Sequence, residues 1–262
     1  MARFATGGLE LAYDDIDGGG AGVILLVHGF AASRTESWNR LGWLDAFQRK
    51  GWRAIAPDLR GHGESDKPHE AAAYDRAAMT DDLVALLDRV GVGRADVLGY
   101  SMGAHLALGL ALRHADRVGR LILGGVGARL IDGGGPIAEA GMTMAEAMRA
   151  PDAEAIPDAT LRGFRRFAEQ EGCDREALAA CSEGKSRALT ADDLFGLHCE
   201  TLIVAGARDE IAGNPARLAE AIPEGKSVTL PACDHFTAIP HALFKAAVFD
   251  FLEGWLDAPD FE

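Results

Sequence analysis

Short apolar runs alternate along the chain with segments whose apolar residues recur at helical spacing. Leu83, Leu86, Leu87 and Val90 illustrate the second kind, and their segment ends at Gly91. Six short runs have the length and composition of buried strands: Val23–Val27, Trp52–Ala56, Asp96–Gly99, Arg120–Leu123, Thr201–Ala205 and Ser227–Leu230. Because these strands alternate with helices, the pattern predicts an α/β fold with a mostly parallel sheet covered by helices on both faces.

The two ends of the chain extend this pattern. The segment Arg3–Asp15, with Gly7 and Gly8 at its centre, predicts an antiparallel hairpin added at the edge of the sheet. The last segment predicts a helix, because its apolar residues recur at helical spacing: Leu243, Ala247, Phe251 and Trp255.

One long region interrupts the alternation. Between Arg129 and His198 no segment predicts a strand, and three prolines divide the region into short helices: Pro136, Pro151 and Pro157. A plain connection between two strands is much shorter than this. We therefore expect residues 129–198 to form a helical cap, inserted between a first core segment, 1–128, and a second core segment, 199–262.

The charge balance narrows the range of partners. Lys and Arg together number 26 and Asp and Glu 40, which gives a formal net charge of −14. This balance repels phosphate backbones and anionic lipid head groups, so we expect neither nucleic acid nor a membrane as a partner. The first ten residues lack a signal-peptide core, and no apolar run approaches the roughly 18 residues of a membrane span. These features predict a cytoplasmic protein.

The cysteines and histidines indicate no metal site. The four cysteines are widely spaced, without a C-x-x-C pair, and the eight histidines form no H-E-x-x-H motif. Free thiols are therefore expected at Cys173, Cys181, Cys199 and Cys233. We expect no metal, and the chemistry considered below needs no organic cofactor.

The most specific motif is G-x-S-x-G at Gly99–Gly103, between a predicted strand and a predicted helix. A serine on such a turn is held in a strained conformation and presented to a substrate. Gly99 and Gly103 are small because strand and helix approach closely there. The helix N-terminus beside Ser101 offers free N–H groups and a positive dipole end to a developing oxyanion.

A serine hydroxyl is a weak nucleophile, so this motif requires a base and a carboxylate that orients the base. His235 follows the last predicted strand, and Asp209 follows the strand before it. The order Ser101, Asp209, His235 is the one expected for a nucleophile on a strand-to-helix turn of an α/β sheet. Both partners also lie just beyond the carboxyl ends of strands, where open parallel sheets build their sites.

On these motifs the sequence resembles the α/β-hydrolase fold family, in particular its small capped esterases and lactonases. The resemblance covers about 23–126 and 201–256 and rests on five segments: His28-Gly29-Phe30, Asp58–Ser65, Gly99–Gly103, Gly206–Asp209 and Asp234-His235-Phe236. It implies an eight-stranded, mostly parallel sheet with helices on both faces and a helical cap insertion. It departs from the family's frequent pattern at Asp234 and Ala104, where glycine is common.

The resemblance also implies roles for individual residues. Ser101 would be the nucleophile, Asp209 the acid and His235 the base of a catalytic triad. The backbone N–H groups of Phe30 and Met102 would form the oxyanion hole. The remaining motif residues would support the site: His28, Gly29, Gly99 and Gly103. Gly29 suits this place because a missing side chain lets its loop approach the substrate.

These residues predict a serine hydrolase that cleaves a small carboxylic ester or lactone through an acyl-enzyme on Ser101. The same triad also serves C–C bond hydrolases acting on diketone-type substrates and perhydrolases, so both stay open. A non-catalytic ligand-binding protein on this scaffold is a further alternative. Epoxide hydrolase and haloalkane dehalogenase chemistry are disfavoured, because family members of those types carry Asp where this chain has Ser101.

Other polar residues near the motifs have ordinary structural interpretations. We expect His105, one helical turn after Ser101, to be packed in its helix rather than to act as a second base. Asp58 and His62 could be mistaken for an acid–base pair, but the glycines around them indicate a tight loop.

Three further features carry weaker expectations. Glu210 could replace Asp209 as the orienting carboxylate, although the family pattern favours Asp209. The acidic pair Asp81-Asp82 is expected to be solvated at a helix start. Three methionines of the cap could equally line an acyl pocket or pack within the cap: Met142, Met144 and Met148.

Overall fold

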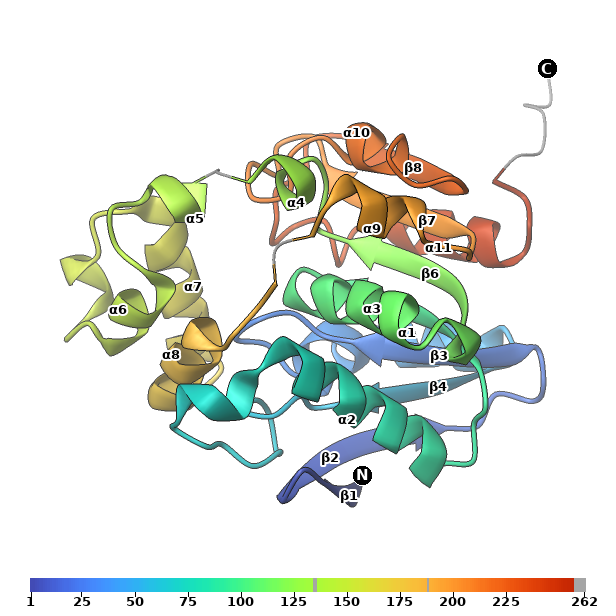
Figure 1. Cartoon of the computed structure of the whole chain (residues 1–262), viewed down its shortest axis with the longest axis horizontal. Helices are drawn as coiled ribbons and strands as arrows, with labels where there is room; N and C mark the ends of the chain where they lie inside the picture. Colours follow the sequence, from blue (N-terminus) through green and yellow to red (C-terminus); the bar gives the residue numbers. More distant parts are fainter. Residues whose placement is uncertain (134–135, 188, 257–262) are drawn as a thin grey trace.

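Eight strands form one sheet in the computed structural model, which describes residues 1–133, 136–187 and 189–256 (Figure 1). The strands are β1 Ala2–Thr6, β2 Leu9–Ile16, β3 Gly22–Val27, β4 Trp52–Pro57, β5 Ala95–Tyr100, β6 Val118–Gly124, β7 Thr201–Gly206 and β8 Gly225–Leu230. Their order in space is β1-β2-β4-β3-β5-β6-β7-β8. All neighbours from β4 to β8 are parallel, and β2 pairs with β4 antiparallel. The predicted mostly parallel eight-stranded sheet is confirmed.

The N-terminal hairpin is also confirmed. β1 and β2 pair antiparallel, with Thr6 opposite Leu9 across a two-residue turn. That turn consists of Gly7 (φ 53°) and Gly8 (φ 78°), and a tight hairpin turn with two positive φ angles is the geometry that glycine permits most easily. The hairpin lies at the outer edge of the sheet, where β2 pairs with β4, and the Ala12 N–H donates to the Ser65 Oγ at 2.9 Å.

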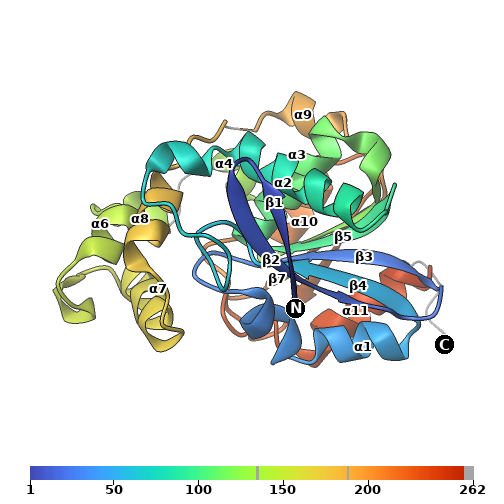
Figure 2. The same cartoon turned by 90° about the horizontal axis from the view of Figure 1, so that it is seen from below.

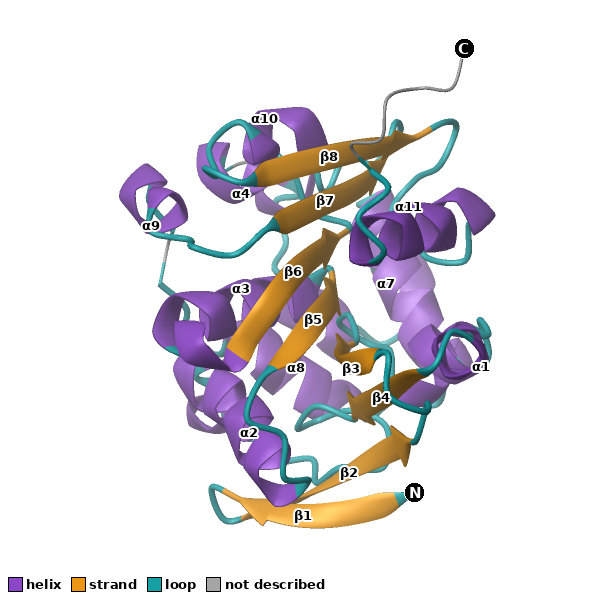
Figure 3. Cartoon of the chain, turned by 90° about the vertical axis from the view of Figure 1, so that its right-hand side faces the viewer, coloured by secondary structure: helices purple, strands orange, loops and turns teal. Residues whose placement is uncertain are grey.

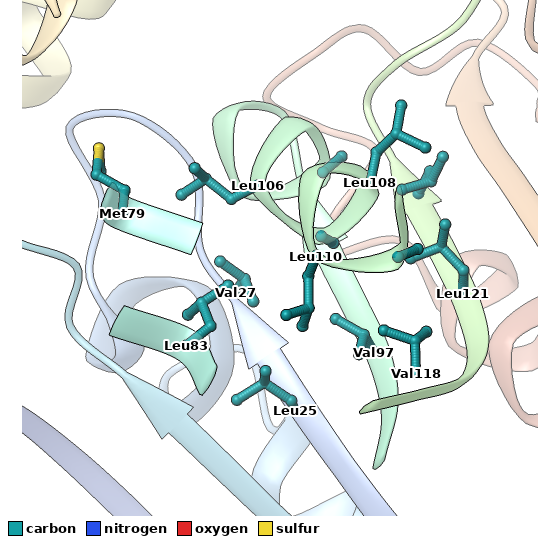
Figure 4. Close-up of a cluster of buried hydrophobic side chains, with 14 of the residues drawn as sticks. Leu25, Val27, Met79, Leu83, Val97, Leu106, Leu108, Leu110, Val118 and Leu121 are labelled. Atoms are coloured by element: carbon teal, nitrogen blue, oxygen red, sulfur yellow. The ribbon is translucent and has the colours of Figure 1, made fainter. Parts of the chain in front are cut away.

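Helices cover both faces of the sheet (Figure 3). The core helices are α1 Trp43–Arg49, α2 Arg76–Arg89, α3 Met102–Arg113, α10 Pro215–Ala219 and α11 Ala242–Leu252, with single short turns η1 Thr35–Asn39, η2 Ala71–Tyr74 and η3 Ala115–Arg117. One buried apolar cluster joins α2, α3 and α10 to one face of the sheet, and a second joins α1 and α11 to the other. Figure 4 shows part of the first cluster, in which Leu106 and Leu110 of α3 lie near Val27 and Val97 of the strands.

Helix α2 starts earlier than expected and corrects one prediction. It begins after the N-cap Asp75, whose carboxylate accepts hydrogen bonds from two backbone N–H groups, so Asp81-Asp82 lies inside the helix rather than at its start. Asp81 is exposed, but Asp82 is only 4% exposed. Its carboxylate forms a two-point ion pair with Arg60, with both N–O distances 2.7 Å. A charge buried in this way needs such a partner.

The region between β6 and β7 contains only helices and turns among its described residues, as predicted. The helices are α4 Arg129–Asp132, α5 Pro136–Glu139, α6 Met144–Arg149, α7 Ala159–Gln170, α8 Arg175–Glu183 and α9 Ala191–Phe195, with the turn η4 Ala153–Ala155. Helices α6, α7 and α8 lie to one side of the sheet in two perpendicular views (Figures 1 and 2). Helix α4 instead lies close to the core helix α10, where Asp132 pairs with Arg217 at 2.8 Å, and Leu194 of α9 belongs to the first core cluster. We refer to residues 129–198 as the cap segment.

The cap segment has its own small apolar clusters. Phe164 and Ala168 of α7 pack with Met148 of α6 and Leu178 of α8. Hydrogen-bonding side chains at the N-caps begin these helices, for example Asp158 at α7. The three cap methionines lie in or against these clusters: Met142, Met144 and Met148. Of the two predicted roles, packing within the cap is therefore the one observed.

All four cysteines are free, as expected, although only Cys181 and Cys233 are buried. In the part of the chain that the structure describes, no helix has both the length and the apolar character needed to cross a bilayer.

Candidate active site

Ser101 lies on a sharp turn between β5 and α3. Its backbone has φ 53° and ψ −116°, a conformation that residues other than glycine rarely adopt. The Ser101 N–H donates to the Gly124 carbonyl at 2.8 Å, which ties the turn to the neighbouring strand β6. The strained serine turn that the G-x-S-x-G motif predicts is therefore present between a strand and a helix.

The two motif glycines permit this turn because no side chain would fit in their place. A Cβ at Gly99 would lie 2.2 Å from the Gly103 carbonyl oxygen. At Gly103 it would lie 2.1 Å from the Val27 carbonyl oxygen. Both contacts are with backbone, which cannot move aside as a flexible side chain can.

The sheet brings three predicted residues together. Strands β5, β7 and β8 all end at the same edge, and Ser101, Asp209 and His235 follow them. The Ser101 Oγ lies 2.9 Å from His235 Nε2, and His235 Nδ1 lies 2.9 Å from Asp209 Oδ2. Asp209 and His235 are 4% and 5% exposed. The arrangement allows His235 to accept the Ser101 proton while Asp209 holds its other nitrogen as N–H.

The neighbours of this chain of hydrogen bonds hold it in place. Asp209 Oδ1 accepts a hydrogen bond from the Ala212 N–H at 2.9 Å. The Tyr100 hydroxyl donates to the His235 carbonyl oxygen at 2.5 Å. Glu210, the alternative carboxylate, is exposed. Among the described residues, the carboxylate that bonds to His235 Nδ1 is that of Asp209 and not that of Glu210. Asp209 is thus the carboxylate that meets the histidine.

Asp234, where the family often has glycine, shapes the loop that carries His235. Its Oδ1 accepts hydrogen bonds from the Phe236 N–H at 3.0 Å and the Thr237 N–H at 2.9 Å. The Thr237 hydroxyl donates to the same oxygen at 2.7 Å and is the main cause that lowers the pKa of Asp234. An aspartate that bonds to the backbone two residues on forms a tight turn, so this departure from the family pattern has a structural role.

Two backbone donors lie beside Ser101. Neither the Phe30 N–H nor the Met102 N–H donates a hydrogen bond to any residue that the structure describes. Gly29 brings its loop close, since a Cβ there would lie 3.4 Å from the Ser101 Cβ. His28, which is fully buried, fixes the loop from behind: its Nδ1 donates to the Gly29 carbonyl at 2.8 Å and its Nε2 accepts the Leu59 N–H at 3.0 Å.

A cavity of about 290 Å³ opens on one side of Ser101, and we call it the aromatic cavity. His235 lines this cavity beside Ser101. The apolar part of the wall combines residues of the core and of the cap segment: Phe30, Tyr100, Phe164, Phe167, Phe236 and Ile239. Phe164 lies at the centre, with its ring centroid 5.2 Å from Phe236 and 6.1 Å from Phe30. Arg40 and Glu171, paired at 2.7 Å, also line this cavity.

Sequence reasoning did not assign Phe164 and Phe167 to the site. The two residues are three apart on α7, so their side chains share one side of the helix. The sequence shows this spacing, but it does not show which side of a short cap helix faces the core. The methionines considered for this role lie elsewhere, in the cap clusters.

The prediction that His105 is packed in its helix is wrong. It follows Ser101 by one turn of α3, but its side chain is exposed and faces a second cavity, of about 200 Å³, which also reaches Ser101. The helix places it there because residues four apart share a face. The other structural interpretation holds: Asp58 and His62 do not bond to each other, and Asp58 pairs with Arg34 and accepts the Glu64 N–H at 2.8 Å.

Burial sets the charge state of several groups around the site. It lowers the pKa of His28 to about 4 and that of His62 to about 3. It also lowers the pKa of His105 to about 4, and the nearby positive charge of Arg76 adds to this shift. These three imidazoles are neutral at pH 7. For His28 the neutral form also agrees with its hydrogen bonds, because one nitrogen donates and the other accepts.

Comparison with known proteins identifies the family of this chain. A family model described as alpha/beta hydrolase fold matches residues 22–130. The 2-hydroxymuconate semialdehyde hydrolase of Pseudomonas sp. (strain CF600) is 31% identical over 90% of this chain and 88% of that protein. The chain belongs to the α/β-hydrolase fold family. This confirms the family and the fold class expected from the motifs.

Solved α/β-hydrolase structures superpose along nearly the whole chain. An esterase from Thermogutta terrifontis, with malate bound, is 28% identical, covers 98% of both chains and gives a TM-score of 0.74. The enol-lactonase from Burkholderia xenovorans LB400 is 26% identical, covers 97% of this chain and 99% of its own, and gives a TM-score of 0.75. Hydrolases of different substrates thus share this α/β-hydrolase architecture.

Proposed function

We propose that this protein is a serine hydrolase that cleaves a small carboxylic ester or lactone, with Ser101, His235 and Asp209 as its catalytic triad. The observation that carries the proposal is the hydrogen-bond chain from Ser101 Oγ through His235 to Asp209. A protein that only binds a ligand has no need of these three groups in this order. The esterase and the enol-lactonase among the similar structures support the substrate class.

The first half of the reaction follows from the geometry. His235 Nε2 takes the proton of Ser101 as Oγ attacks the carbonyl carbon. The carbonyl oxygen becomes an oxyanion, which the N–H groups of Phe30 and Met102 stabilise; losing one such donor typically costs about 2.7–4 kcal/mol. Asp209 stabilises the imidazolium. The C–O bond then breaks, the leaving alkoxide takes the proton from His235, and an acyl-enzyme remains on Ser101.

The second half uses water in the same way. His235 takes a proton from water, whose oxygen attacks the acyl carbon, and a second oxyanion forms in the same hole. The Ser101 Oγ leaves with the proton returned by His235, so the acid is released and the serine is restored. The aromatic cavity beside Ser101 would hold an apolar group of the substrate.

C–C bond hydrolysis is the second candidate, and one observation favours it. Two relatives that match over most of both chains are named for a semialdehyde, and that name indicates no ester bond. Hydrolysis of such a compound would break a carbon–carbon bond, and the same serine attack, on an aldehyde or ketone carbonyl, would begin it. A diketone-type substrate would then replace the ester.

A substrate panel tests the proposal. Aryl esters of increasing acyl length, simple lactones and diketones are offered to the purified protein and to Ser101→Ala, with hydrogen peroxide as an alternative to water. We expect hydrolysis of at least one ester or lactone series and a loss of at least 1,000-fold in Ser101→Ala with an unchanged melting temperature. Cleavage of diketones alone would select the second candidate. Equal rates for both proteins would remove Ser101 as the nucleophile.

A further inference from the structure

The second cavity beside Ser101, which we call the His105 cavity, differs chemically from the aromatic cavity. Its wall includes Ser101 and His105 at the start of α3, Arg129 and Leu130 of α4, and Ile211 of the loop after β7. No Asp or Glu lies among the described residues that line it, although the chain carries 40 acidic residues. The aromatic cavity, in contrast, includes two glutamates in its wall.

His105 presents unused hydrogen-bonding groups to this cavity. Neither ring nitrogen bonds to another residue in the described part of the chain. Its surface is exposed because the cavity, rather than packed side chains, lies against it. The neutral imidazole offers one N–H donor and one acceptor.

Arg129 brings a positive charge to the same cavity. Its backbone N–H donates to the Ala212 carbonyl at 3.1 Å, and its Cγ lies close to Gly213, which anchors the residue at the rim. Its guanidinium forms no ion pair with any described residue, and the side chain is exposed. Arginine suits a planar carboxylate because its N–H groups can donate two parallel hydrogen bonds.

A second guanidinium near His105, that of Arg76, forms no ion pair with a carboxylate of the described residues. Arg76 contacts the sulfur atoms of Met79, Met102 and Cys181 at 3.2, 3.5 and 3.6 Å, and donates to the Cys181 carbonyl oxygen at 3.3 Å. Burial is the main cause that lowers the pKa of His105, and the positive charge of Arg76 adds to it. Arg76 and Arg129 thus both place a positive charge near His105.

The position of His235 decides which part of the substrate enters which cavity. A leaving alkoxide takes its proton from His235, and His235 lines the aromatic cavity but is not in the wall of the His105 cavity. The leaving alcohol would therefore fit the aromatic cavity, and the acyl chain would then extend into the His105 cavity.

We infer that the His105 cavity binds a carboxylate at the far end of the acyl chain, with Arg129 and His105 as its hydrogen-bond donors. This inference rests on the proposed ester hydrolysis and makes the substrate class more specific. The class is the half-ester of a short dicarboxylic acid with an apolar alcohol, cleaved to the dicarboxylate and the alcohol. Hydrolysis adds one water across the C–O bond and leaves the second carboxylate unchanged.

Two matched esters test this inference. Benzyl hydrogen succinate carries the carboxylate, and benzyl 4-methylpentanoate carries an isopropyl group in its place. We expect the protein to prefer the succinate by at least tenfold in kcat/KM. We expect Arg129→Gln and His105→Leu each to lower that preference at least tenfold, mainly through KM of the succinate, because the carboxylate is bound alike before and during reaction.

Arg89→Gln is the matched control, since Arg89 is exposed at the C-terminal end of α2, in the wall of neither cavity. It makes the same charge change and is expected to keep the preference of the parent protein. Hydrolysis of both esters with no preference, or a preference that both Arg129→Gln and His105→Leu retain, would overturn the inference and leave the ester hydrolase intact.

A binding measurement separates failure of the inference from failure of the proposed function. Calorimetric titration of Ser101→Ala with each ester needs no turnover. If neither ester is hydrolysed by the parent protein but Ser101→Ala binds benzyl hydrogen succinate at least tenfold more tightly than the neutral ester, and Arg129→Gln removes that difference, the carboxylate site stands and ester hydrolysis fails. Equal binding of the two esters would overturn the carboxylate site.

Discussion

The aromatic cavity has two walls: residues of the core, including Ser101 and His235, form the core wall, and Phe164 and Phe167 of the cap segment form the cap wall. Behind the core wall, at the turn that carries Ser101, backbone touches backbone: a Cβ at Gly103 would lie 2.1 Å from the Val27 carbonyl oxygen. On the cap wall side chain touches side chain, and the rings of Phe164 and Phe236 lie 5.2 Å apart, an ordinary aromatic contact. The core wall fixes the positions of reacting atoms, whereas the cap wall supplies apolar surface. Substitutions on the core wall should therefore cost far more than those on the cap wall.

The largest effect is expected at Asp209, which lies behind the core wall and holds His235. Asp209→Asn should lower kcat by about 10⁴-fold, because an amide no longer holds His235 with its acceptor nitrogen towards Ser101. The neighbouring Glu210→Gln makes the same change of charge at an exposed side chain and should keep kcat within twofold. Steady-state rates on an ester that the parent protein hydrolyses measure both. A loss below tenfold in Asp209→Asn would contradict the assigned role.

A pair of glycines compares the two walls through stability. Gly103→Ala should lower the free energy of unfolding by about 3 kcal/mol or more, because the new methyl group meets fixed backbone. Gly163 lies within α7, and a Cβ there would lie 3.8 Å from the Phe236 ring, so Gly163→Ala should instead stabilise by roughly 0.5–1 kcal/mol. Urea unfolding measures both values. Similar losses at both positions would remove the distinction between the walls.

These two walls also differ in how far the sequence predicts them. The core wall can be predicted because strand ends and glycines are local features of the sequence. Strands β3, β5, β7 and β8 lie where the apolar runs indicated. The hydrogen-bond chain of the site joins residues that follow three of these strands. The sheet register then places those strand ends side by side, with Val27 opposite Gly99.

The cap wall and the buried polar contacts are long-range features that local patterns do not reveal. Nothing in the sequence near Phe164 tells that α7 turns this residue towards His235 rather than towards solvent. The pairing of Arg60 with Asp82 likewise depends on how α2 docks on the sheet. His105 has the spacing of a packed helix residue, and only the placement of the cap segment leaves a cavity beside it.

Mild acid should act on two buried histidines of the core. His28 and His62 are buried in the core and neutral, with pKa values lowered to about 4 and 3, whereas in the unfolded chain they titrate near 6.5. The unfolded chain thus binds more protons below pH 6.5, so the free energy of unfolding should be constant above this pH and fall between about pH 6.5 and 4. The expected loss is on the order of 3 kcal/mol for each histidine.

Urea unfolding at pH 7, 6, 5 and 4.5 measures this loss. His62→Asn keeps a donor in the position of Nδ1, which bonds to the Arg60 carbonyl, but removes the titration. It should flatten part of the decline relative to the parent protein. Unfolding free energies that stay constant down to pH 4.5 would contradict the neutral buried state of these histidines.

The smallest effect on activity is expected on the cap wall. Phe167→Ala should raise KM for benzyl or aryl esters roughly threefold to tenfold, with a smaller change in kcat, because it removes apolar surface that contacts substrate but no reacting atom. Phe195→Ala is the control, since Phe195 of α9 is 74% exposed and in the wall of neither cavity. A fall in kcat comparable to that of Asp209→Asn would place Phe167 in the catalytic machinery instead.

The central claim is that His235 and Asp209 make the hydroxyl of Ser101 nucleophilic. Reaction with a fluorophosphonate, followed by intact-mass and peptide mass spectrometry, tests it without knowledge of the natural substrate. We predict one adduct per chain, located on Ser101, absent in Ser101→Ala and formed at least 100-fold more slowly in His235→Gln. A parent protein that stays unlabelled under conditions that modify a known serine hydrolase, or labelling that is equally fast in His235→Gln, would contradict the account.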